Sequence, residues 1–214
     1  AVVEVAGLGT RGSEGLETCG ADVETDAFKC VIEWLTGKRN AYTDKENNNK
    51  IVANWSNGNV AMTGRSYGGT TDFAVASTGV EGLKTIVPVA GIASWYEYTN
   101  SQGIATDGVA YSDDLALECA NLDYTAGNSG KKTGNSITYN NFNCPALIVH
   151  GLNDDNVRTK QFQMMYDTFK DAGQTVKLLL HQGAHITPDY DSHKTSLLIG
   201  KESYDSILNK WFSY

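Results

Sequence analysis

The sequence lacks several features that would indicate particular classes of protein. No apolar run approaches the roughly 20 residues that a membrane-spanning helix needs. Lysine and arginine total 17 against 25 aspartate and glutamate residues, which gives a net charge of −8 with both signs mixed along the chain. Because nothing in this balance would neutralise phosphates, we expect no nucleic acid and no membrane as a partner.

Cysteine and histidine are also sparse. The four cysteines, Cys19, Cys30, Cys119 and Cys144, have neither Cys-x-x-Cys spacing nor a histidine pairing suited to zinc. We therefore expect no metal site and no organic cofactor. The disulfide state stays open, and so does the compartment.

The beginning of the chain has neither an initiator methionine nor a signal peptide. It opens inside an apolar run, residues 1–6, with no basic region before it. This run is predicted to be a strand inside a sheet, so we expect N-terminal strands to be missing from the sequence. At 214 residues the chain suits one domain with a sizeable core, and we expect one partial domain over residues 1–214.

Short apolar runs alternate with helical patterns, which favours a mostly parallel sheet flanked by helices, an α/β fold. Strands are predicted at 60–63, 85–89, 146–150 and 176–180. The first helix is predicted to bury Val23, Ala27, Val31, Trp34 and Leu35. Three later helices are predicted, which contain Phe73, Phe162 and Tyr204 respectively. The weakly patterned stretch 95–143 is expected to be a short cap insertion.

The run Gly64-Arg65-Ser66-Tyr67-Gly68 lies between an apolar strand and a helix, which is the context of a nucleophile elbow. Such a turn strains the serine backbone, and we expect side chains in place of either glycine to collide with the neighbouring strand and helix. The Tyr67 N–H at the helix start could stabilise an oxyanion. The same pattern also occurs in turns that merely join a strand to a helix.

An acid and a histidine follow later strands in the order typical of α/β hydrolases. Asp154 comes just after the strand that ends near His150, and His185 lies in the loop after the next strand. Both would reach the carboxyl edge of a parallel sheet. Ser66 would then attack, His185 would take and return the proton, and Asp154 would orient the imidazole.

Each of these assignments has an alternative. Asp155 could replace Asp154, or both could be turn residues that cap the following helix. His150 and His181 lie at strand ends and are expected to be structural. His193 lies in a polar loop and is expected to be a solvated surface residue.

Several segments, in this order, resemble one family. Residues 55–70 resemble the elbow region of X-prolyl dipeptidyl aminopeptidases and their cocaine-esterase relatives, and residues 79–83, 90–98, 150–157 and 181–186 look like the X-prolyl enzymes. The resemblance implies an α/β-hydrolase fold. It also implies release of an N-terminal X-Pro dipeptide from a peptide substrate, through an acyl-enzyme on Ser66.

The resemblance also implies substrate-binding residues. It places Trp95 and Tyr98 against the proline ring in the S1 pocket, where flat aromatic faces suit a rigid apolar ring. It aligns Asp113, with Asp114 close behind, with the acid that receives the α-ammonium group. The alternatives are that the two aromatics only pack the cap, and that the acid is solvated or caps a short helix.

The sequence also departs from the family. Gly68 stands where X-prolyl enzymes commonly have leucine, and the cap insertion looks shortened. The family supplies a second oxyanion donor from a tyrosine upstream of residue 1, so we expect this chain to be a fragment.

Two other functions stay open: an acyl-ester or amide hydrolase of the cocaine-esterase or acylase type, and a non-catalytic hydrolase-like module. The resemblance suggests a cytoplasmic protein, although secreted or surface-attached members would look the same. The oligomeric state is open, a homodimer included.

Overall fold

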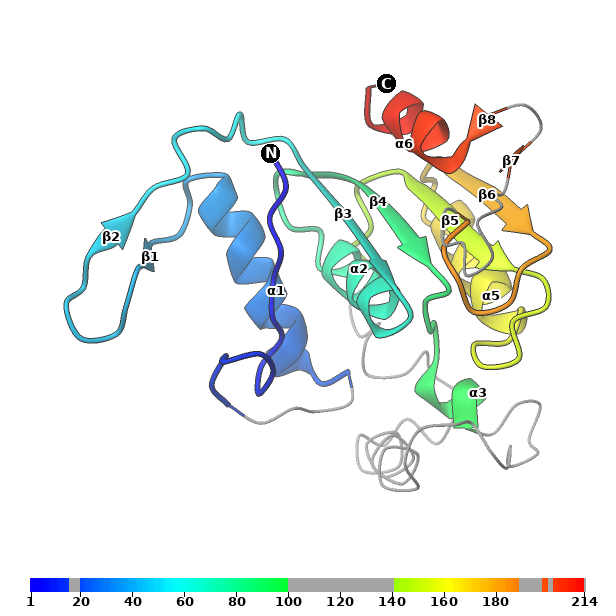
Figure 1. Cartoon of the computed structure of the whole chain (residues 1–214), viewed down its shortest axis with the longest axis horizontal. Helices are drawn as coiled ribbons and strands as arrows, with labels where there is room; N and C mark the ends of the chain where they lie inside the picture. Colours follow the sequence, from blue (N-terminus) through cyan, green and yellow to red (C-terminus); the bar gives the residue numbers. More distant parts are fainter. Residues whose placement is uncertain (16–19, 100–140, 189–197, 200–201, 214) are drawn as a thin grey trace.

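The computed structural model of the chain describes residues 1–15, 20–99, 141–188, 198–199 and 202–213 (Figure 1). Its central feature is a four-stranded parallel sheet in the order β3-β4-β5-β6. The strands are β3 (Val60–Arg65), β4 (Leu83–Val89), β5 (Ala146–Gly151) and β6 (Val176–His181). The predicted mostly parallel sheet is therefore confirmed, and each predicted strand forms with one or two further residues.

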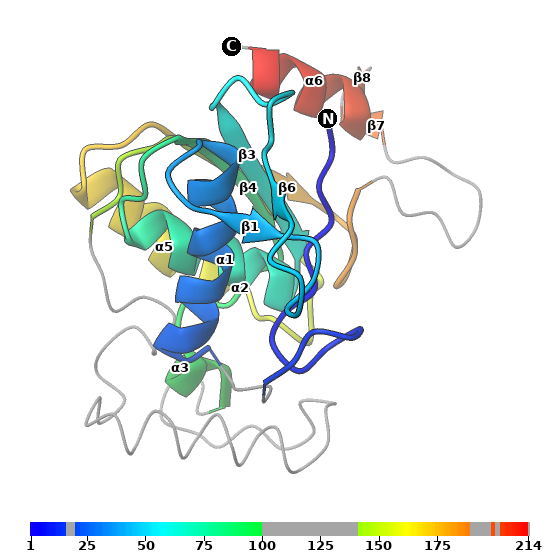
Figure 2. The same ribbon diagram turned by 90° about the vertical axis from the view of Figure 1, so that its left-hand side faces the viewer.

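Helices cover both faces of this sheet (Figure 2). On one face α1 (Asp22–Leu35), α2 (Tyr67–Ser77) and α5 (Lys160–Asp171) enclose the larger core with Ile86 and Ile148. On the other face α6 (Tyr204–Ser213) packs Tyr204 and Trp211 against Val87 and Val149. Because β4 and β5 are covered on both sides, their sequences are nearly continuous apolar runs.

The helix after Ser66 is longer than the sequence pattern indicates. The prediction began near Phe73, whereas α2 begins at Tyr67 and includes Gly68 and Gly69. Glycine and threonine have low intrinsic helix propensity, but every residue from Gly69 to Ser77 is buried. Packing against the sheet outweighs local propensity here.

Two predictions about the N-terminal part are wrong. Residues 1–6 form no strand, and Val2 is 92% exposed, because no described strand lies beside them to take their backbone hydrogen bonds. In α1 Val23 is 54% exposed, while its neighbours Glu24 and Thr25 are buried. Ile32 is buried in place of Val31, and of the five residues predicted on the buried face only Leu35 is buried, so this face is rotated along the helix.

Five short elements complete the described structure. β1 (Ala41–Tyr42) and β2 (Lys50–Ile51) form an antiparallel hairpin that extends away from the sheet (Figure 1), and β7 (Leu198–Ile199) pairs with β8 (Glu202–Ser203). The stretch predicted to be a cap begins with the short helix α3 (Trp95–Thr99). Most of that stretch, residues 100–140, lies outside the described residues.

The described residues include two of the four cysteines. Cys30 and Cys144 are free thiols, whereas Cys19 and Cys119 lie outside the described ranges. Within those ranges no helix combines the length and the apolar character needed to cross a bilayer.

Candidate active site

Ser66 occupies a strained turn between β3 and α2. Its φ of 60° and ψ of −119° lie in a region that residues other than glycine rarely adopt. The Ser66 N–H donates to the Val89 carbonyl at 2.8 Å, and the Ser66 carbonyl accepts from the Thr70 N–H at 2.9 Å. Strand β4 and the first turn of α2 therefore hold the strained conformation in place.

Close backbone packing explains the glycines around this turn. A Cβ atom on Gly64 would lie 2.6 Å from the Gly68 carbonyl carbon, so the collision predicted at Gly64 is confirmed. The same prediction for Gly68 is wrong, since a Cβ there meets nothing within 4 Å. Gly69 is instead the second required glycine, because its Cβ would lie 2.8 Å from the Val89 carbonyl oxygen.

A buried carboxylate orients His185. Asp154 Oδ2 lies 2.8 Å from His185 Nδ1, and the Asp154 side chain is 0% exposed. The other oxygen, Oδ1, accepts the N–H groups of Asn156 at 3.0 Å and Val157 at 2.9 Å. With Oδ2 accepting the Nδ1 proton, the lone pair of the imidazole is on Nε2.

The Nε2 atom of His185 is the atom that could accept a proton from a nucleophile. It is buried and has no hydrogen-bond partner among the residues that the structure describes. Ser66, Asp154 and His185 follow β3, β5 and β6, three parallel strands whose carboxyl ends meet at one edge of the sheet. The geometry thus joins Asp154 to His185 and puts Ser66 at the same edge.

The loops after β5 and β6 are joined through their backbones, which is how the acid and the histidine meet. The Leu152 N–H donates to the His181 carbonyl at 2.7 Å, and the Asn153 N–H donates to the Gly183 carbonyl at 3.2 Å. A Cβ on Gly151 would lie 2.2 Å from the Ala184 carbonyl oxygen, so only glycine permits this approach.

Two further histidines line the interior beside Asp154. His150 is 0% exposed, and its Nε2 donates to the Val157 carbonyl at 2.8 Å. Burial lowers the pKa of His150, and it also lowers the pKa of His181, whose Nδ1 accepts the Gly183 N–H at 3.1 Å. The lowered pKa favours the neutral imidazole in both, and both rings are bonded to backbone, as residues that support the neighbouring loops would be.

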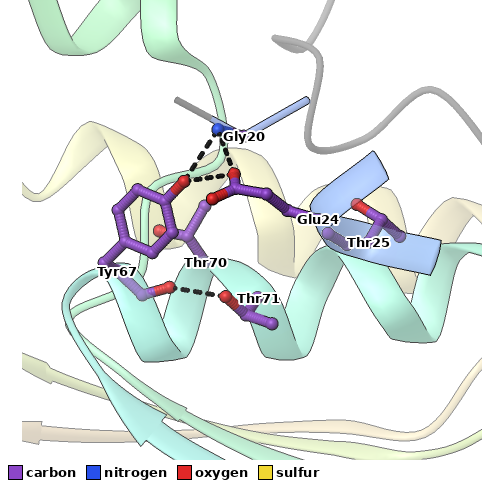
Figure 3. A pocket seen from close by; sticks show the side chains of 7 residues that line it. Gly20, Glu24, Thr25, Tyr67, Thr70 and Thr71 are labelled. Atoms are coloured by element: carbon purple, nitrogen blue, oxygen red, sulfur yellow. Dashed lines mark hydrogen bonds between the residues drawn. The ribbon is translucent and has the colours of Figure 1, made fainter. Parts of the chain in front are cut away.

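The side chain of Tyr67 is held by a buried acid that the sequence analysis missed (Figure 3). The Tyr67 hydroxyl donates to Glu24 Oε2, and the Gly20 N–H reaches the same oxygen at 2.8 Å. Glu24 belongs to the first turn of α1 and is 7% exposed. Tyr67 is also the first residue of α2, so its N–H lies at the N-terminus of that helix.

Trp95 and Tyr98 lie in an aromatic cluster that begins next to Ser66. The Tyr67 and Trp95 ring centroids are 5.6 Å apart, and those of Trp95 and Tyr98 are 5.8 Å apart in an edge-on arrangement. Trp95 is 1% and Tyr98 5% exposed, and Val157 from the acid loop completes the cluster. The predicted S1 aromatics therefore lie together beside the elbow.

The remaining candidates divide into exposed residues and residues outside the described ranges. Asp155 is exposed, whereas Asp154 is buried, so the histidine bond distinguishes the two acids. Asp113, Asp114 and His193 lie outside the described residues. Within the described residues no group of three or more metal-binding side chains occurs.

The fold is that of the α/β hydrolases. A solved acylaminoacyl peptidase in complex with Z-Gly-Gly-Phe-chloromethyl ketone matches 73% of this chain and 24% of its own, with a TM-score of 0.51 and 22% identity. A Pyrococcus furiosus esterase matches 82% of this chain and 58% of its own, with a TM-score of 0.51 and 18% identity. At these identities the likeness concerns the fold alone.

Sequence comparison gives the family. The family model for X-Pro dipeptidyl-peptidase (S15 family) matches residues 1–133 and 123–187, and the chain belongs to this family. The Xaa-Pro dipeptidyl-peptidase of Ligilactobacillus salivarius (strain UCC118) is 39% identical over 100% of this chain and 30% of its own length. That of Pediococcus pentosaceus (strain ATCC 25745) is 35% identical over 100% of this chain and 29% of its own. The chain thus spans less than a third of these relatives.

Proposed function

We propose that this chain carries the catalytic residues of a serine peptidase that releases X-Pro dipeptides from the N-termini of peptides. The observation that carries the proposal is the 2.8 Å bond between buried Asp154 and His185, at the sheet edge that also holds the strained Ser66. Family membership supports the substrate class, because the relatives are named for that activity.

The proposed mechanism uses the side chains in named roles. His185 Nε2 takes the proton of the Ser66 hydroxyl as Oγ attacks the carbonyl carbon that follows proline, and Asp154 stabilises the resulting imidazolium. The Tyr67 N–H binds the oxyanion that forms. His185 then gives its proton to the leaving amine, and water, deprotonated by the same nitrogen, hydrolyses the acyl-enzyme and frees the dipeptide.

Substrate selection is assigned to two further features. The cluster of Trp95, Tyr98 and Tyr67 lies beside Ser66, and we assign to it the rigid apolar ring of proline, which suits flat aromatic faces. Asp113 is proposed to bind the free α-ammonium group by a charge-assisted hydrogen bond, which would select unblocked N-termini.

The test measures hydrolysis of Gly-Pro-p-nitroanilide by the full-length protein. Ser66→Ala should lower kcat by about 10⁶-fold, the scale of losing a serine nucleophile, while Ser206→Ala on α6 should leave it unchanged. An N-blocked Gly-Pro analogue should be cleaved poorly. If Ser66 reacts with a fluorophosphonate but only simple acyl esters are turned over, the protein is an esterase and the proposal is wrong.

A further inference from the structure

A side chain at the start of α5 is hydrogen-bonded to the backbone segment that leads into α3. Gln161 is 1% exposed, and its Oε1 accepts the N–H groups of Ala93 at 2.7 Å and Ser94 at 2.9 Å. Its Nε2 donates to the Ser94 carbonyl at 3.2 Å. One buried side chain thus makes three hydrogen bonds to the two residues immediately before Trp95.

Two other contacts connect the same segments. The Tyr98 hydroxyl donates to Asn156 Oδ1 at 2.8 Å, and Lys160 Nζ lies 2.6 Å from Glu97 Oε2. Asn156 also donates its N–H to Asp154, so this contact reaches the acid loop directly. The aromatic cluster and the acid loop are therefore joined at several points.

Gln161 differs from these neighbours in burial. The Lys160 side chain is 38% exposed, and ion pairs at such positions contribute little. The Ala93 and Ser94 N–H groups are buried, and without Gln161 both would lose their acceptor. The segment would have to shift to satisfy them, and Trp95 would move with it.

We infer that Gln161 is a positioning residue for proline selectivity, acting through the backbone of Ala93 and Ser94 on the place of Trp95. The inference rests on the proposed function, because it assumes that the aromatic cluster receives the proline ring. A residue that merely stabilised the fold would affect all substrates alike. A positioning residue changes the discrimination between proline and a smaller residue at the same place.

The experiment compares kcat/KM for Gly-Pro-p-nitroanilide and Gly-Ala-p-nitroanilide in the full-length protein. Gln161→Leu should lower the proline-to-alanine ratio about tenfold or more, because misplacing a positioning element by an ångström can cost up to about 100-fold. Labelling of Ser66 by a small fluorophosphonate should stay within about twofold. The matched control is Gln163→Leu, an exposed glutamine on the same helix, which should change none of these values.

A second variant covers the case in which Gln161→Leu does not fold. Gln161→Glu keeps the acceptor for both N–H groups, but its other oxygen faces the Ser94 carbonyl and repels it unless the introduced carboxyl is protonated. The proline-to-alanine ratio should fall, and the fall should be greater at higher pH. Any pH dependence of the chemical steps that both substrates share cancels in this ratio.

The outcomes are distinguishable. An unchanged ratio in every folded variant, or an equal loss for both substrates and for labelling, overturns the role of Gln161 alone. Failure of the unmodified protein to cleave the proline substrate, with Ser66 still labelled, overturns the proposed function and this inference with it.

Discussion

Replacing Asp154 with asparagine changes a single atom of the side chain and should reverse the hydrogen bonding at His185. The Asn156 and Val157 N–H groups both point at Oδ1, so the amide oxygen must take that position. The amide nitrogen then takes the position of Oδ2, 2.8 Å from His185 Nδ1. A donor there forces Nδ1 to accept, which puts the imidazole proton on Nε2.

The magnitude follows from this tautomer. With a proton on Nε2, His185 cannot accept the Ser66 proton, and comparable substitutions in serine proteases lower kcat by about 10⁴-fold. That loss corresponds to about 5 kcal/mol of transition-state stabilisation. The folded state should be affected much less, because the asparagine oxygen still accepts both backbone N–H groups.

The assay is hydrolysis of Gly-Pro-p-nitroanilide by the full-length protein at saturating substrate. Asp155→Asn is the matched control, since Asp155 is the adjacent exposed acid and should tolerate the change. If Asp154→Asn keeps more than about a tenth of kcat, or if Asp155→Asn loses as much, then the tautomer argument and the choice of acid are both wrong.

Three further predictions concern packing, a buried hydrogen bond and pH. Gly151→Ala would put a Cβ 2.2 Å from the Ala184 carbonyl oxygen and should cost about 1 to 3 kcal/mol in chemical unfolding, with a loss of kcat as the histidine loop shifts. Glu24→Ala leaves the Tyr67 hydroxyl without its acceptor and should cost about 1 to 3 kcal/mol, while Glu24→Gln keeps an acceptor and should cost less. Burial raises the pKa of Asp72 well above 3.8, so the folded state keeps a proton that the unfolded state releases. The free energy of unfolding should therefore fall as the pH rises above 3.8. Asp72→Asn should abolish this fall and be more stable than the unmodified protein at neutral pH, by about 1 to 3 kcal/mol in urea titrations at several pH values.

Exposed acids serve as controls for the last two predictions. Asp26 lies on the same helix as Glu24, and Asp171 is the last residue of α5. The control variants are Asp26→Ala and Asp171→Asn. Both should leave the free energy of unfolding within about 0.5 kcal/mol. A pH dependence that survives in Asp72→Asn, or a Glu24→Ala protein as stable as Asp26→Ala, would contradict the burial arguments.

The sheet could be predicted from the sequence because its central strands are apolar on both faces. Runs such as Ala146–Gly151 have few alternatives once they are bounded by turns and followed by helical patterns. Parallel strands then carry the residues that follow them to one edge. The meeting of Asp154 and His185 was therefore predictable from chain order, although the 2.8 Å bond was not.

The failures share a physical cause, which is that partners distant in sequence decide burial. The pattern of apolar residues predicts that Glu24 and Asp72 face solvent, yet both are buried. The acceptor role of Glu24 depends on Tyr67, 43 residues away. Likewise an apolar run such as residues 1–6 becomes a strand only beside another strand, and the described residues offer it none.

The open space above Gly68 has a consequence for variation and design. A Cβ atom there meets nothing within 4 Å among the described residues, in contrast to Gly64 and Gly69, where a Cβ would lie under 3 Å from backbone. Since glycine in a helix is less favourable than other residues by roughly 0.5 to 1 kcal/mol, we expect Gly68→Leu to stabilise α2 while the turn at Ser66 keeps its conformation.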